Sequence, residues 1–298
     1  MVVAEIERGG FRGRGEAVPY PRYGETTAQV LADIETLRQP VEAGLDRARL
    51  QGLMKPGAAR NALDCALWDL EAKTVGSRAW TLAGRDRLDP VKTAYTLSLG
   101  PPEVMAGAAR AAARRPLLKL KIGGADDIDR VEAVRAAAPK ARLIVDANEA
   151  LSFEDLRRLA PALASLRVKL LEQPLPAGED QALEGYDSPA PLCADESIHT
   201  RGELDAVARR YAFVNIKLDK AGGLTEALAL RAAAEGRGLE VMAGCMVGTS
   251  LAMAPALLIA QGAAFVDLDG PLLLARDRTP GLTYLGSMIE PPTPALWG

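Results

Sequence analysis

Four stretches of the sequence decide the fold: RLIVDAN at residues 142–148, VKLLEQP at 168–174, LCADES at 192–197 and FVNIKLD at 213–219. Each stretch is a short apolar run that ends in polar or charged residues, which is typical of a buried strand of a parallel sheet. Successive stretches lie about 25 residues apart, roughly the length of one strand, one helix and their loops. The repetition predicts strands whose ends share one face of the molecule.

Apolar runs of strand character occur eight times, at residues 91–97, 117–122, 142–145, 168–171, 192–194, 213–216, 239–243 and 264–266. Between them lie stretches with apolar residues at helical spacing, at residues 128–138, 153–163, 204–210, 224–235 and 250–261. Such alternation predicts an α/β fold with a parallel sheet, and eight strands favour a closed TIM-like (β/α)7β barrel. An open, doubly wound sheet is the alternative.

The region before the repeats predicts a separate α+β capping domain over residues 1–88. Residues 1–20 indicate a strand pair joined at Gly9 and Gly10, and residues 58–73 carry a helical stripe of apolar side chains. We expect the barrel to span residues 89–274. The proline-rich tail, residues 275–298, is expected to pack back on the capping domain.

Composition favours a folded protein that acts on a small molecule. The 298 residues are 48% hydrophobic and 25% charged, with a net charge of −3, so no electrostatic attraction to nucleic acid or to an anionic membrane is expected. Three isolated cysteines form no zinc or disulfide pattern, and no apolar run is long enough to span a membrane. These features predict a cytoplasmic protein.

Two lysines follow each other at alternate positions of one predicted strand. Lys119 and Lys121 project from the same face of that strand, so their ammonium groups repel each other. Repulsion and burial both favour a neutral amine, which suits Lys121 to act as a general base. An edge strand with solvated lysines is the alternative for this pair taken alone.

Three acidic residues end three consecutive predicted strands: Asp146, Glu172 and Asp195. Carboxylates that converge on one end of a barrel repel each other unless a cation holds them together. Ligands that are all carboxylate oxygens suit Mg²⁺, so we expect one Mg²⁺ per subunit at this position. Lys217 lies one repeat further on and, in a closed barrel, stands across the mouth from Lys121. Two bases on opposite sides of a carbon allow inversion of its configuration.

These motifs together resemble the enolase superfamily, muconate-lactonising subgroup, and within it the L-Ala-D/L-Glu (dipeptide) epimerases. The resemblance covers most of the chain and rests on residues 16–25, Lys119-x-Lys121, Asp146-Ala147-Asn148, Glu172-Gln173-Pro174, Asp195-Glu196-Ser197, residues 215–227, Gly244-Cys245-Met246 and Asp267-Leu268-Asp269-Gly270-Pro271.

The resemblance implies a role for each of the candidate residues. Asp146, Glu172 and Asp195 become the metal ligands, and Lys121 and Lys217 become the two acid/base lysines. Lys119 holds the substrate and tunes its neighbour, while Asp267 and Asp269 bind the free ammonium group of a small dipeptide. The implied reaction is a 1,1-proton transfer at the α-carbon of the C-terminal residue, in the metabolism of peptidoglycan peptides, by a homo-oligomer.

Two other functions remain open: an N-acylamino acid racemase or o-succinylbenzoate synthase of the same superfamily, and a noncatalytic barrel. Relatives of this family begin with one more strand and a lid loop, so the capping domain is expected to be shortened at its N-terminus. Cys245 is interpreted as a packing residue because no histidine is near it in the sequence to activate it. Gly222 and Gly223 give only a weak indication of a phosphate cradle.

Overall fold

The computed structural model describes residues 1–298, which divide into two compact units. Unit 1 consists of Met1–Lys92, Ile216–Ala232 and Ala243–Gly298, and unit 2 consists of Thr93–Asn215 and Ala233–Met242. The predicted boundaries, residues 1–88 for a cap, 89–274 for a barrel and 275–298 for a tail, stay a prediction.

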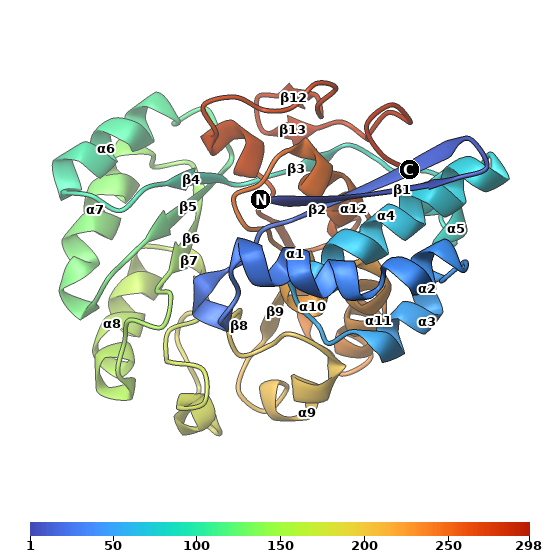
Figure 1. Cartoon of the computed structure of the whole chain (residues 1–298). Coiled ribbons are helices and arrows are strands. Elements are labelled where there is room, and N and C mark those ends of the chain that lie inside the picture. The colour runs from blue at the N-terminus through green and yellow to red at the C-terminus, as the bar shows by residue number, and fades with distance from the viewer. The chain divides into compact units, whose positions relative to one another are not determined.

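Unit 2 is built on parallel strands that alternate with helices. Its strands are β4 (Tyr95–Leu97), β5 (Leu117–Lys121), β6 (Arg142–Asp146), β7 (Val168–Glu172), β8 (Leu192–Ala194) and the greater parts of β9 (Phe213–Ile216) and β10 (Glu240–Ala243). Helices α6 (Pro102–Ala111), α7 (Ile128–Ala137) and α8 (Phe153–Ser165) lie beside these strands, as Figure 1 shows. Shorter helical segments follow: η2 (Ala125–Asp127), η3 (Asp180–Leu183), η4 (Arg201–Glu203) and α9 (Leu204–Val207).

The order of the strands distinguishes the two predicted topologies. The sheet has eight strands in the order β11-β10-β9-β8-β7-β6-β5-β4, in which β10 is Glu240–Ala243 and β11 is Phe265–Val266. A doubly wound sheet reverses its strand order near the middle, whereas a barrel keeps it. The uninterrupted order therefore confirms the predicted α/β sheet with barrel connectivity and removes the doubly wound alternative.

One predicted strand is wrong in its extent. The apolar run at residues 91–97 splits into β3 (Val91–Lys92) and β4, with Thr93 and Ala94 between them. β3 pairs antiparallel with β13 (Met288–Ile289), which pairs with β12 (Tyr284–Leu285), so these three strands form a sheet of their own. An apolar run indicates burial but not a pairing partner, and this run passes from one sheet into another.

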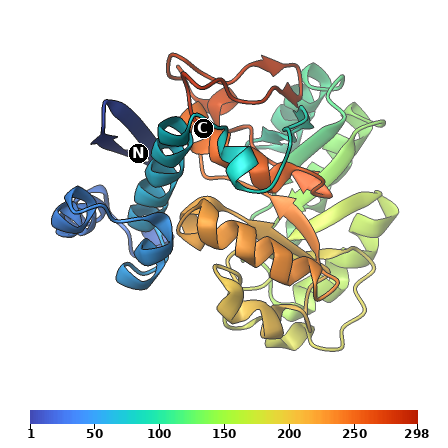
Figure 2. The ribbon, with the colours of Figure 1, turned by 90° about the vertical axis from the view of Figure 1, so that its right-hand side faces the viewer.

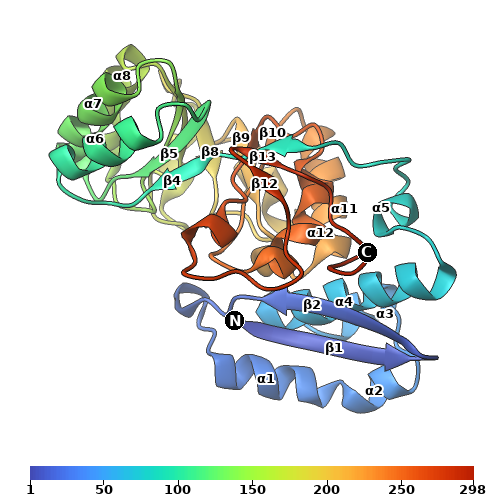
Figure 3. The ribbon, with the colours of Figure 1, turned by 90° about the horizontal axis from the view of Figure 1, so that it is seen from above.

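Unit 1 begins with a hairpin of β1 (Val2–Arg8) and β2 (Phe11–Ala17), joined at Gly9 and Gly10 as the sequence predicts. Both glycines have positive φ angles, 59° and 82°, which suits a tight two-residue turn. Helix α4 (Ala58–Val75) packs against β2, and a Cβ atom on Gly15 would lie 2.7 Å from the backbone nitrogen of Ala66. The hairpin and the helices next to it appear in Figures 2 and 3.

The other helices of this N-terminal part are η1 (Pro21–Tyr23), α1 (Thr27–Thr36), α2 (Arg38–Glu42), α3 (Arg47–Leu53) and α5 (Ala79–Leu82). Later segments contribute α10 (Leu218–Ala221), most of α11 (Leu224–Glu235), α12 (Ser250–Ala260) and η5 (Gly270–Leu273). The most apolar of the helices, α12, is buried along its entire length but has only 11 residues. None of the helices has both the length and the apolar character that a membrane span requires.

The C-terminal tail is hydrogen-bonded to α4 within unit 1. The indole nitrogen of Trp297 donates to the carbonyl of Cys65 at 3.0 Å, and the backbone nitrogen of Gly298 donates to Asp69 Oδ1 at 2.7 Å. Figure 2 shows the C-terminus beside this helix. Trp297 is fully buried, so the tail is part of the core of this unit.

Candidate active site

The register of β5, β6 and β7 places three predicted site residues in one row. Lys121 is the direct neighbour of Asp146, and Asp146 is the direct neighbour of Glu172. Neighbours in register share a face of the sheet, and Lys119 shares the face of Lys121 because it lies two residues before it. These three side chains and Lys119, which lies one layer before them on the same face, form a group of charges near the carboxyl ends of the strands, which we call the charged row.

Lys119 lies between the two carboxylates of this row. Its Nζ is 2.7 Å from Glu172 Oε2 and 3.1 Å from Asp146 Oδ2, and all three side chains are buried. A buried ammonium group at these distances compensates part of the charge of both carboxylates, which would otherwise be costly to bury.

Lys121 is the accessible member of the charged row. Its side chain is 41% exposed, and its Nζ lies 3.6 Å from Asp146 Oδ2. Nζ also donates to Asn148 Oδ1 at 2.5 Å, while the Asn148 backbone nitrogen donates to Asp146 Oδ1 at 3.0 Å. Asn148 has a φ of 39°, a conformation that asparagine tolerates better than most residues. It thus links Lys121 to the carboxylate beside it, a role that the sequence pattern did not reveal.

Asp195 follows β8, and its backbone is held by Gln173. Gln173 Oε1 accepts hydrogen bonds from the backbone nitrogens of Asp195 at 2.8 Å and Ser197 at 3.1 Å. Its Nε2 donates to the Ser197 hydroxyl and to Tyr211, so this fully buried amide joins the ends of β7 and β8. Gln173 lies in the motif Glu172-Gln173-Pro174, but the pattern alone gives it no role.

A further amide fixes the glutamate of the row. Asn215 Nδ2, from β9, donates to Glu172 Oε1 at 2.7 Å, and both residues are fully buried. The signal that could have revealed Asn148, Gln173 and Asn215 is their type and position, because each is an amide directly beside or near a strand end that carries charge.

The donor set fits a hard divalent cation. Asp146, Glu172 and Asp195 are at most 1% exposed and offer carboxylate oxygens, the ligands that Mg²⁺ prefers. No group of three or more His, Cys, Asp and Glu side chains already stands close enough together to hold an ion. Between two of the three carboxylates, Asp146 and Glu172, lies the ammonium group of Lys119. The chemistry of the residues fits the predicted cation, whereas their present arrangement is that of an ion-paired cluster.

In unit 1, the remaining predicted residues surround Cys245. Burial raises the pKa of the Cys245 thiol well above its ordinary value, the negative charges of Asp267 and Asp269 raise it further, and Lys217 acts in the opposite direction. Asp267, Asp269 and Lys217 are themselves buried. A thiol in this environment stays protonated, which supports its interpretation as a packing residue and not a nucleophile.

Tyr284 fixes the backbone between the two aspartates. The Tyr284 hydroxyl donates to the carbonyl of Leu268 at 2.8 Å, between Asp267 and Asp269 in the chain. The backbone nitrogen of Asp267 donates to the carbonyl of Ala243 at 2.8 Å. Two buried carboxylates two residues apart on a fixed backbone can bind a cationic group such as an ammonium.

Residues of α4 hold the turn that follows Lys217 by hydrogen bonds, and we call this set of contacts the grip. Asp219 Oδ1 accepts from Asn61 Nδ2 and from the backbone nitrogen of Val18, both at 2.9 Å. The Arg60 guanidinium donates to the carbonyls of Ala221 at 2.6 Å and Gly222 at 2.9 Å.

Gly222 and Gly223 are explained by this grip. Both have positive φ, and a Cβ on Gly222 would lie 2.6 Å from Arg60 Nε, whereas one on Gly223 would lie 2.6 Å from Asp64 Cγ. Asp64 Oδ2 accepts from the backbone nitrogen of Thr225 at 2.9 Å. Close approach of α4 therefore accounts for the two glycines, for which the sequence suggested a weak phosphate cradle.

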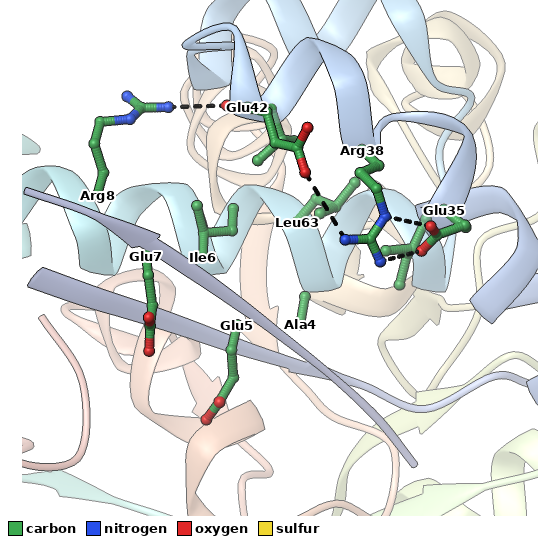
Figure 4. Close-up of a pocket in the computed structure, with 11 residues that line it drawn as sticks. Ala4, Glu5, Ile6, Glu7, Arg8, Glu35, Arg38, Glu42 and Leu63 are labelled. Carbon is green, nitrogen blue, oxygen red and sulfur yellow. Dashed lines mark hydrogen bonds and ion pairs between the residues drawn. The ribbon is translucent and has the colours of Figure 1, made fainter.

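A cavity of 340 Å³ lies elsewhere in unit 1, between β1 and the helices α1 and α2. Figure 4 shows its lining, in which Arg38 pairs with Glu35 and Glu42, and Arg8 donates to the carbonyl of Val41. No residue predicted to act in catalysis lines this cavity. Glu5 and Glu7 of the lining pair with Arg12, so the carboxylates of this cavity already have cationic partners and it is not a second candidate active site.

Comparison with known proteins identifies the family. Residues 1–84 match the N-terminal domain model of mandelate racemase / muconate lactonizing enzyme, and residues 103–281 match the enolase C-terminal domain-like model.

Two curated relatives and one solved structure extend this match. The chain is 48% identical to an L-Ala-D/L-Glu epimerase of Escherichia coli over 95% of this chain and 89% of the relative. It is 45% identical to an N-acetyl-D-glutamate racemase of Pseudoalteromonas over 100% and 95% of the two chains.

The solved structure is an enolase family member from Agrobacterium tumefaciens with homology to dipeptide epimerases, which contains sodium and L-Ala-L-Glu with an ordered loop. It is 55% identical, with a TM-score of 0.97, and the match covers 99% of this chain and 91% of that one. The chain therefore belongs to the enolase superfamily and has its fold, a TIM-like barrel with an α+β capping domain.

Proposed function

We propose that this protein is a dipeptide epimerase, an isomerase that inverts the α-carbon of the C-terminal residue of L-Ala-L-Glu and L-Ala-D-Glu. The observation that carries the proposal is the charged row of Lys119, Lys121, Asp146 and Glu172. It supplies a base and a carboxylate cluster of the kind needed for proton abstraction beside a carboxylate. The relative from Escherichia coli with this activity matches 95% of the chain.

In the proposed mechanism, Lys121 and Lys217 each exchange a proton with one face of the α-carbon. Lys121 is suited to this task because its amine is accessible and its neighbour Asn148 orients it. Lys217 directly precedes α10, the turn that α4 holds by hydrogen bonds. One lysine removes the proton and the other returns it, which inverts the centre.

The carboxylates Asp146, Glu172 and Asp195 would hold Mg²⁺, which when bound stabilises the negative charge that develops on the substrate carboxylate. Lys119 is placed to bind the same carboxylate because its ammonium group lies within the cluster. Asp267 and Asp269 bind the free amino terminus of the dipeptide.

The second candidate function is racemisation of an N-acylated amino acid, and the relative from Pseudoalteromonas favours it. Its substrate has no free ammonium group, so it has no need of the buried pair Asp267 and Asp269. An o-succinylbenzoate synthase would also lack this need. A noncatalytic barrel would not require any of the lysines.

Asp269→Asn separates these functions. The dipeptide epimerase should lose at least about tenfold in kcat/KM for L-Ala-L-Glu, since a charged hydrogen bond contributes about 1.5–3 kcal/mol. Activity should be measured by chiral chromatography with L-Ala-L-Glu and N-acetylglutamate in parallel. Equal activity of the variant and the unchanged protein on the dipeptide, or turnover of N-acetylglutamate alone, would contradict the proposal.

Calorimetric titration with Mg²⁺ tests the noncatalytic alternative, since a barrel without a metal site would show no binding. The expected substrate class is confined to dipeptides from peptidoglycan, without nucleic acid or membrane as partners. A cytoplasmic location and a homo-oligomeric state stay predictions of the sequence.

A further inference from the structure

The turn α10 connects Lys217 to a set of buried contacts. The carbonyl of Lys217 accepts hydrogen bonds from the backbone nitrogens of Lys220 at 3.1 Å and Ala221 at 3.0 Å. Any displacement of this four-residue turn would therefore displace the backbone that carries the Lys217 side chain.

Both ends of the turn are held by consecutive residues of α4. Asn61 donates to Asp219 in the first half of the turn, and Arg60 donates to the carbonyls of Ala221 and Gly222 at its end. Asp219 also accepts from the backbone nitrogen of Val18, directly after β2. One side-chain oxygen, Asp219 Oδ1, thus joins the lysine turn, α4 and the end of the hairpin.

Other contacts of α4 reach the same segment without touching the turn. Asp64 accepts from the backbone nitrogen of Thr225, and Trp68 Nε1 donates to the Thr225 hydroxyl at 2.9 Å. These contacts fix the start of α11, seven or eight residues after Lys217. They provide a comparison set, because they stabilise the same packing but do not hold the lysine.

We propose that Asp219 is a positioning residue for Lys217, and that it acts as a hydrogen-bond acceptor for Asn61 and Val18 and not through its charge. The proposal rests on the function proposed above, in which Lys217 serves one face of the α-carbon. Both donors use Oδ1, and an asparagine at this position keeps a carbonyl oxygen there. Asp219→Asn and Asp219→Ala therefore separate the acceptor from the charge.

The test uses exchange of the α-proton in ²H₂O, started separately from each epimer of L-Ala-Glu. A lysine that removes a proton can return deuterium to the same face, so each epimer exchanges through its own base. Asp219→Ala should reduce epimerisation in both directions, and exchange from only one epimer, by about tenfold or more, the loss of one or two hydrogen bonds. Exchange from the other epimer should stay within about twofold of the unchanged protein.

Two variants serve as controls. Asp219→Asn should retain exchange from both epimers, and Trp68→Phe, which loses a bond of the comparison set, should change both rates equally. If Asp219→Ala does not fold by circular dichroism, Asn61→Ala removes the donor and should give the same one-sided loss, smaller in size.

Equal loss from both epimers in Asp219→Ala would show a general structural role and overturn the proposal, as would one-sided loss in Asp219→Asn. Absence of exchange in the unchanged protein with either epimer would instead contradict the proposed function, so the two failures are distinguishable.

Discussion

The charged row in unit 2 and the grip of α4 on the turn after Lys217 in unit 1 bury polar groups in different ways. In the row, opposite charges compensate each other across neighbouring strands, as Lys119 does for Asp146 and Glu172. In the grip, Asp219 and Asp64 are buried carboxylates held by amide and backbone donors. A charge-compensated cluster depends on each of its charges, whereas a hydrogen-bonded grip depends on close packing.

Removal of the central charge should have the largest effect on stability. Lys119→Met leaves Asp146 and Glu172 buried without their ammonium partner, which should lower the free energy of unfolding by about 3–5 kcal/mol in the absence of divalent cations. Chemical denaturation with and without Mg²⁺ measures the effect. Mg²⁺ should restore much of the loss because it supplies positive charge to the same carboxylates.

The matched control is Lys169→Met, on β7, whose side chain is exposed. It should change stability by less than about 0.5 kcal/mol. If Lys119→Met and Lys169→Met behaved alike, charge compensation would not distinguish the row from the surface.

The close packing of α4 against the segment after Lys217 should be sensitive to the addition of a single methyl group. Gly223→Ala would place a Cβ 2.6 Å from Asp64 Cγ at a φ of +115°, which should cost about 3 kcal/mol through overlap and backbone strain. Thermal denaturation would detect this loss.

Gly238→Ala is the control for Gly223→Ala, since Gly238 has a φ of +78° but no atom within 4 Å of its added Cβ. It should cost only the backbone term, about 1 kcal/mol. A similar loss in both variants would mean that close approach of α4 does not constrain the turn.

The carboxylate of the grip should give the smallest effect, visible in its pH dependence. Burial raises the pKa of Asp219 from 3.8 to about 6, and the negative charges of Glu25 and Glu16 add to the rise, against the hydrogen bonds from Val18 and Asn61. Between pH 3.8 and about 6, Asp219 in the folded protein therefore keeps a proton that the unfolded chain has already lost. The stability that this proton contributes is present at low pH and is lost as the pH rises through 6.

Between pH 4.5 and 7, this group should lower the free energy of unfolding by about 2 kcal/mol in the unchanged protein. Asp219→Asn has no such proton, so the stability difference between the two proteins should shift by that amount in favour of the variant. Denaturation at both pH values measures the shift. A constant difference would place Asp219 in a more solvated environment than the structure shows.

The same contrast explains what the sequence could predict. The charged row comes from residues at the ends of strands, so the repeat of apolar run and polar residue predicts its members and their order. The alternation of strands and helices and the hairpin at Gly9 and Gly10 follow from local pattern in the same way. The roles of Lys121, Lys217 and the three acids in catalysis stay predictions.

The grip could not be predicted because it joins residues such as Asn61 and Asp219, which are far apart in the chain and have no periodic relation. Gly222 and Gly223 can be recognised in the sequence as a glycine pair, but such a pair does not indicate which helix packs against it. The prediction of a single strand at residues 91–97 was wrong for a related reason, since apolar character does not specify which sheet a strand joins. Gln173 and Asn215 act through hydrogen bonds to neighbouring strands, which sequence spacing alone does not specify.

The measurement that tests the proposed function most directly is α-deuterium incorporation in ²H₂O with L-Ala-L-Glu and Mg²⁺, followed by mass spectrometry and NMR. One deuterium should appear at the glutamate α-carbon of both epimers, and Lys121→Ala or Lys217→Ala should each abolish epimerisation while retaining exchange from one epimer. No incorporation with this or any other dipeptide, from a folded protein that binds Mg²⁺, would contradict dipeptide epimerisation.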